Sequence, residues 1–153
     1  MNYFDLFCEV IPGLEEDERA WVEGVLRVEL PDDPQDKEGW RRALDALAAL
    51  GVEYADDYYW PGFQWGMEGA DLLLWSDDNF SEDNLVSFIQ AFIRRFRPQM
   101  VFRATIACTG DKWRVGVFGG YWLVISANRV LGGNTRQAAN LDLDIPLLKG
   151  NAA

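Results

Sequence analysis

Three segments of the chain carry apolar side chains at helical spacing, and each predicts a helix. They are residues 14–28, 37–50 and 82–97. The third has the widest apolar face, with apolar positions at i, i+3, i+4, i+7, i+8 and i+11 counted from Leu85. Ser81 is a suitable N-cap for this helix, and Pro98 ends it.

Alternating apolar and polar positions predict strands before, between and after these helices. The strands cover residues 3–11, 63–67, 71–76, 100–108 and 121–127. The sequence Glu68-Gly69-Ala70 joins the second and third strands as the turn of a hairpin. In the first strand, one set of apolar side chains shares a face that we expect to be buried: Phe4, Leu6, Cys8 and Val10.

The order strand, helix, helix, strand, strand, helix, strand, strand predicts an α+β fold. We expect a mainly antiparallel sheet of about five strands, with two to three helices packed on it, in a single domain over residues 1–153. From about residue 128 onward the pattern is weak. Residues 134–139 fit a short helix, and residues 141–146 fit a terminal strand or an extended segment.

The composition is typical of a folded protein without a membrane segment. Hydrophobic residues make up 49% of the chain and aromatic residues 14%, which is too rich for disorder. No apolar run approaches the roughly 20 residues of a membrane helix, and the N-terminus lacks the features of a signal peptide. We therefore expect a cytoplasmic protein without membrane association, in which Cys8 and Cys108 are buried and reduced.

The chain contains no histidine, and this excludes several kinds of chemistry. Ser-His-Asp and Cys-His nucleophile systems are impossible, and two separated cysteines cannot build a zinc site. Asp77 begins a stretch like a calcium loop, but Glu82 and Phe88 stand where that loop needs Gly and Glu. The sequence therefore predicts no catalytic residue, no metal and no cofactor, with a small carboxylate-based enzyme as an alternative.

Residues 110–120 form a glycine-rich loop that contains Lys112 and Arg114. Its backbone amides could cradle an anion, but the Walker and dinucleotide-binding glycine motifs are absent. We favour a tight turn, because glycines mark bends and bulges more often than phosphate sites. A homodimer is an alternative hypothesis. In it, an acidic surface of a second copy would contact the basic side chains Lys112, Arg114, Arg94, Arg95 and Arg97.

Charge is distributed unevenly along the chain. Residues 1–83 hold 22 of the 25 acidic residues and 5 of the 14 basic ones, and the formal net charge is −11. An acidic surface repels nucleic acid and attracts basic protein surfaces, including those that hold a phosphate backbone. The partner-binding candidates are therefore Glu15, Glu16, Asp17, Glu18, Asp32, Asp33, Asp36, Asp56, Asp57, Tyr58, Tyr59, Asp77, Asp78, Glu82 and Asp83.

Two of these clusters have simpler explanations. Acidic surfaces also serve solubility, and acids in the first turn of a helix complement its dipole. The segment around Asp56 and Asp57 is rich in aromatic residues, which together with acids suit a protein interface. Packing of Trp60 and Phe63 in the core explains these aromatic residues equally well.

Three stretches resemble a family of small, uncharacterised proteins of bacteria and mobile elements. They are residues 7–12 (FCEVIP) with 18–22 (ERAWV), residues 88–98 (FIQAFIRRFRP) and residues 114–120 (RVGVFGG). In that family FLxxFRP precedes one strand and KPRVGEFGGG precedes another, and the likeness covers about two-thirds of this chain. Trp113 replaces the family's Pro, and Val117 replaces its Glu. The family carries no known activity, but mobile elements combined with an acidic chain suggest, by analogy, an anti-CRISPR protein.

The leading hypothesis is thus a non-enzymatic anti-defence protein of a phage or mobile element. It would act as a DNA mimic, binding the basic surface with which a CRISPR effector or nuclease subunit holds nucleic acid, without binding nucleic acid itself. An immunity or antitoxin-type protein that neutralises a basic partner is the main alternative.

Overall fold

The computed structural model describes residues 3–54, 59–110 and 119–134, and it confirms the α+β fold. The elements follow the predicted order, with one additional strand at the end. They are β1 (Tyr3–Ile11), α1 (Glu16–Leu26), α2 (Lys37–Ala49), β2 (Gln64–Glu68), β3 (Asp71–Ser76), α3 (Glu82–Phe96), β4 (Phe102–Gly110), β5 (Gly119–Ile125) and β6 (Val130–Asn134).

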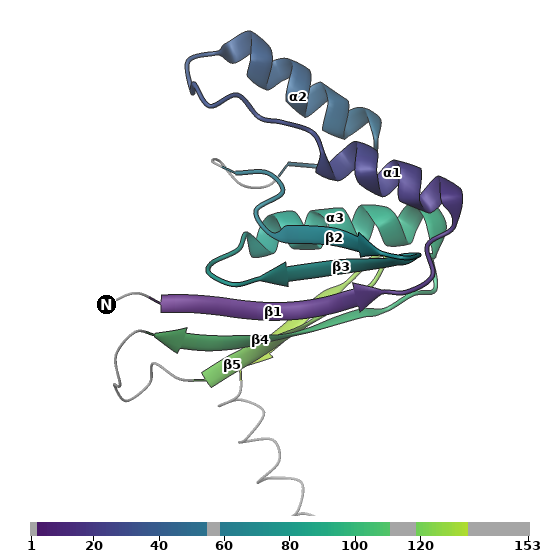
Figure 1. Ribbon diagram of the computed structural model, residues 1–153, viewed down its shortest axis with the longest axis vertical. Helices are drawn as coiled ribbons and strands as arrows, with labels where there is room; N and C mark the ends of the chain where they lie inside the picture. The colour runs from purple at the N-terminus through teal and green to yellow at the C-terminus, as the bar shows by residue number, and fades with distance from the viewer. Residues whose placement is uncertain (1–2, 55–58, 111–118, 135–153) are drawn as a thin grey trace, which may run out of the picture.

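The six strands form an antiparallel sheet in the order β2-β3-β1-β4-β5-β6. The first part of β1 pairs with β4, and its second part pairs with β3. α3 lies against one face of the sheet, α1 lies beside α3, and α2 is outermost (Figure 1). The described helices therefore leave the opposite face of the sheet uncovered.

α3 supplies the centre of the core because its apolar face is wide. Ser81 caps the helix as predicted, since its Oγ accepts a hydrogen bond from the Asn84 N–H at 3.2 Å. The sheet meets this helix with alternate side chains from four of its strands. The buried residues of the two layers include Phe7, Ile11, Leu72, Leu74, Leu85, Phe88, Ile89, Phe92, Ile93, Phe102, Ile106, Leu123 and Ile125. α3 is the longest described helix, with 15 residues, and no described helix is long and apolar enough to span a membrane.

The buried face of β1 is not the predicted one. Phe7 and Ile11 are buried under the helices, whereas Cys8 is exposed and Val10 is 46% exposed on the other face. Both faces of β1 carry apolar side chains, so alternation alone could not identify the face that α3 covers. The expectation that Cys8 is buried is therefore wrong, and Cys108 is only partly buried, although both thiols are free.

The region after residue 128 contains a strand that the sequence did not predict. β6 pairs with β5 along its whole length, although two of its five residues are glycines, which strands disfavour. The second of these glycines, Gly133, leaves no room for a side chain, because a Cβ there would lie 2.7 Å from the indole of Trp122. Asn134 belongs to this strand and does not begin a helix, and residues 135–139 and 141–146 lie outside the described part of the chain.

Candidate functional site

A groove of about 910 Å³ lies between the end of α1, the loop that leads to α2, and β2. Four large aromatic side chains line it, and they come from three separate parts of the sequence: Trp40, Tyr59, Trp60 and Trp65. Trp60 is buried, while Trp40 and Trp65 are half-buried and Tyr59 is 59% exposed. The groove therefore presents aromatic surface to solvent.

Hydrogen bonds to the backbone fix the aromatic walls. The Trp60 Nε1–H donates to the Val25 carbonyl at 3.0 Å, and the Trp40 Nε1–H donates to the Asp33 carbonyl at 3.2 Å. The ring of Tyr54 lies between these two indoles, with centroid distances of 6.1 Å to Trp40 and 6.4 Å to Trp60. The walls are consequently held in place by α1, by the loop and by one another.

Acidic residues surround one side of the groove. Glu29 and Asp32 line it, and Asp33 and Asp36 continue the same loop. Two of these carboxylates also organise the loop, because Asp33 Oδ1 accepts the Gln35 N–H at 2.8 Å and Asp36 Oδ1 caps α2 through the Gly39 N–H at 2.9 Å. All four side chains remain exposed, so their charges are available to a partner.

A single arginine stands among the lining residues of the groove. The guanidinium of Arg27 lies 5.6 Å from the centroid of the Trp65 ring, within cation–π distance. An arginine side chain is thus already accommodated on one aromatic wall. This shows that the wall is chemically suited to a guanidinium.

The structure places only some of the predicted partner-binding residues together at the groove. The loop acid Asp32 lines the same groove as Tyr59, although 26 residues lie between them in the sequence. Asp56, Asp57 and Tyr58 lie outside the described residues. Sequence reasoning missed Glu29, Trp40, Trp65 and Arg27, and only the exposed aromatic residues in an acidic segment offered a signal for this site.

The other two predicted clusters lie at opposite ends of the sheet. Glu15, Glu16 and Asp17 begin α1, which follows the C-terminal end of β1. Asp77, Asp78, Glu82 and Asp83 lie between β3 and the first turn of α3, and β3 runs antiparallel to β1 (Figure 1). These acids are exposed, but they do not form one surface with the groove.

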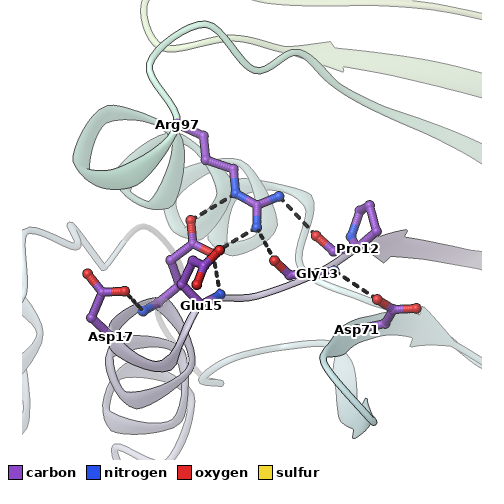
Figure 2. A network of polar contacts seen from close by, with 7 residues as sticks. Pro12, Gly13, Glu15, Asp17, Asp71 and Arg97 are labelled. Atoms are coloured by element: carbon purple, nitrogen blue, oxygen red, sulfur yellow. Dashed lines mark hydrogen bonds and ion pairs between the residues drawn. The ribbon is translucent and has the colours of Figure 1, made fainter.

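Glu18 is a correction to the candidate set, because it is buried and already paired. Arg97 Nε and Nη2 donate to its two carboxylate oxygens at 2.8 and 2.7 Å, and Nη1 and Nη2 donate to the carbonyls of Pro12 and Gly13 at 3.0 Å each (Figure 2). The Glu15 N–H also donates to Glu18 Oε2 at 2.9 Å. Arg97 holds the pKa of Glu18 below its usual value. The pair joins α1 to the end of α3, so the Glu18 carboxylate is engaged within the fold.

A second polar cluster lies near the start of α3. Asp5 pairs with Cys108 across β1 and β4, and Tyr121 of β5 lies beside Glu82. Burial and a hydrogen bond to Asp5 raise the pKa of the Cys108 thiol to about 11. Burial and the charge of Glu82 raise the pKa of Tyr121 as well. Both groups therefore stay protonated at neutral pH.

The raised pKa of Cys108 predicts slow alkylation of the native protein. In a Cys8→Ser variant, which leaves Cys108 as the single thiol, we expect iodoacetamide at pH 8 to react about 100-fold more slowly with folded than with urea-unfolded protein. The factor follows from a shift from 9.0 to about 11, because the thiolate is the reacting form. Mass spectrometry of timed samples measures both rates. Equal rates would contradict the assigned environment of the thiol.

The described residues contain no group of three or more His, Cys, Asp or Glu side chains that could hold a metal ion. The predicted glycine-rich loop with Lys112 and Arg114 falls mostly on residues 111–118, outside the described part. Comparisons with models of protein families, with curated proteins and with solved structures each gave no match. The resemblance to the mobile-element family therefore stays a prediction.

Proposed function

We propose that this chain is a binding protein that takes a basic surface of a partner protein into the aromatic groove. One observation carries the proposal. Two candidate clusters that are remote in sequence, the acidic loop with Asp32 and the aromatic segment with Tyr59, line the same groove. Acids and exposed aromatic rings in one concave site are suited to arginine and lysine side chains.

The chemistry of the groove favours a protein partner over nucleic acid. Tyr and Trp are enriched at the energetic centres of protein interfaces, where a few such residues contribute most of the affinity. The neighbouring carboxylates of Glu29, Asp32, Asp33 and Asp36 repel phosphates and attract cationic side chains. A partner surface that ordinarily holds a phosphate backbone has the matching charge.

In its specific form, the proposal is an anti-defence protein that denies such a surface to nucleic acid. A CRISPR effector or nuclease subunit of the host is the partner class that this chemistry fits. The second form is an immunity-type protein that neutralises a basic toxin, and the same groove and the same acids support it. The two forms share the basic partner surface and differ only in whether the partner belongs to a defence system.

The test of the specific form is the plating of a targeted phage on a host with an active CRISPR system. We expect expression of the chain to restore plating, and we expect Tyr59→Ala or Asp32→Lys to abolish this effect. Loss of a central aromatic contact weakens an interface by about 2 kcal/mol, or about 30-fold in affinity. Asp32→Lys should weaken partner binding more at low salt than at high salt, because salt screens the reversed charge.

Asp77→Lys is the matched control, because Asp77 is an exposed acid in the loop after β3, away from the groove. It should leave the restored plating unchanged at equal protein levels. Unchanged plating with the original chain, across several CRISPR types, would overturn the anti-defence form. If Asp77→Lys is as damaging as Asp32→Lys, the groove is not the binding site.

A further inference from the structure

We infer that the uncovered face of the sheet is the contact surface of a homodimer. This face holds the side chains that alternate with the buried ones on β1, β3, β4 and β5, together with Leu131 and Gly133 of β6, which has no buried residue. The inference does not rest on the proposed function, because it concerns the side of the sheet opposite the described helices.

The outward positions are mostly apolar on β1 and β3 and again on β5 and β6, whereas β4 between them carries Arg103, Thr105, Ala107 and Thr109. Cys8 of β1 pairs with Trp75 of β3, and Val10 pairs with Leu73, so these four side chains form one continuous patch. Val10 is 46% exposed, and Leu131 at the far edge is 45% exposed. Exposed apolar patches rimmed by polar residues are typical of contact sites.

Two indoles broaden the patch toward both edges. Trp122 points across β6, where its ring lies so close to Gly133 that a Cβ there would come within 2.7 Å of it. Trp75 lies in the same way over Gly66 of β2, at an ordinary contact distance of 3.5 Å from the position of a Cβ. Each edge strand thus has a glycine under the ring of its neighbour's tryptophan. The rings lie along the sheet and offer a surface onto which another sheet can pack face to face.

The distribution of charge favours a second copy of the chain as the partner at this face. The chain carries a formal net charge of −11, so two copies repel one another at most of their surface. On the uncovered face of the described strands, acids occur only at Glu68 and Asp71, which are paired at the β2–β3 turn. Arg103 on β4 is the remaining charged residue at the outward strand positions. Packing two such faces keeps the acidic helices and loops of both copies pointing outward.

The test is the mass of the full chain in solution, measured by light scattering after size exclusion. We expect twice the chain mass of 17.4 kDa. Val10→Glu and Leu131→Glu each place a carboxylate in the interface, where an unpaired charge is costly, and should weaken the dimer by about 100-fold or more. Val130→Glu is the matched control. Val130 is next to Leu131 and similarly exposed, at 41%, but it pairs with buried Ile125 on the helix side.

A second measurement does not depend on the variants. The exposed thiol of Cys8 lies on the proposed interface, so its labelling by a maleimide should slow as the protein concentration rises. A monomeric mass for the original chain, or a labelling rate independent of concentration, would overturn the proposal. An equal loss of dimer in Val130→Glu and Leu131→Glu, with circular dichroism unchanged, would also overturn it.

Discussion

Replacing Arg97 with alanine should lower the free energy of unfolding by about 3 kcal/mol. The change leaves the buried carboxylate of Glu18 without its counter-ion and removes the donors to the Pro12 and Gly13 carbonyls. Breaking a buried pair from one side is costly because the remaining charge stays desolvated. Urea unfolding followed by circular dichroism measures the effect.

Arg95→Ala is the control for this change. Arg95 lies in the last turn of the same helix, but it is exposed, and its described contact is with the ring of Phe96 at 5.5 Å. It should change stability by less than about 0.5 kcal/mol. Equal losses for Arg95→Ala and Arg97→Ala would show that the last turn responds to any lost cation and that the ion pair with Glu18 has no special role.

The loss in Arg97→Ala should also depend on pH. Since the pKa of Glu18 is lowered in the folded protein, the pair stabilises the fold fully above the ordinary value of 4.5 and progressively less as pH falls through the folded value. The pKa of Arg97 is raised further above its already high ordinary value by the hydrogen bond to Glu18, so this group adds no dependence in the acid range. Desolvation, which Arg97 no longer offsets, raises the pKa of Glu18 in the variant, so the difference between original and variant should be constant near neutrality and begin to shrink before the pH reaches 4.5.

Much of the fold could be predicted from the sequence, because local signals agreed with tertiary packing. α3 has a cap, a wide apolar stripe and a terminating proline, and its observed bounds differ from the predicted ones by one residue at the C-terminus. β6 could not be predicted, since its glycines have low strand propensity and only pairing with β5 orders them. The covered face of β1 could not be predicted either, because both of its faces are apolar.

The candidate site was less accessible to sequence reasoning. The acidic loop and Tyr59 meet only because α1 and α2 fold back over β2, and no local pattern encodes that approach. Glu18 shows a related difficulty, because it was expected on the surface but is buried. Its position three residues after Glu15 fits a capping role, but its burial depends on Arg97, 79 residues away. Surface acids and buried acids therefore look alike until the tertiary contacts are known.

Replacing Trp21 with alanine should be at least as damaging as the loss of Arg97, at about 4 kcal/mol. The Trp21 side chain is 5% exposed and packs against three phenylalanines of α3, with ring-centroid distances of 5.8 Å to Phe88, 6.1 Å to Phe92 and 5.7 Å to Phe96. The cavity left by alanine would lie at the contact of α1 with α3. Urea unfolding with a circular-dichroism signal, which does not depend on tryptophan emission, measures the loss.

Trp21→Phe tests the hydrogen bond with a smaller loss of packing than alanine causes, because it keeps an aromatic ring but removes the donation from Nε1 to the Leu50 carbonyl at 3.0 Å. That carbonyl belongs to the C-cap of α2, so we expect a loss of about 1 to 2 kcal/mol and faster hydrogen exchange at the end of α2. Trp40→Phe is the matched control, since its Nε1 bond to Asp33 is solvent-exposed and contributes less. If Trp21→Phe left the exchange of α2 unchanged, packing would hold α2 without this bond. The groove wall formed by Trp40, which α2 carries, would then be held by the packing of α2 and not by this bond.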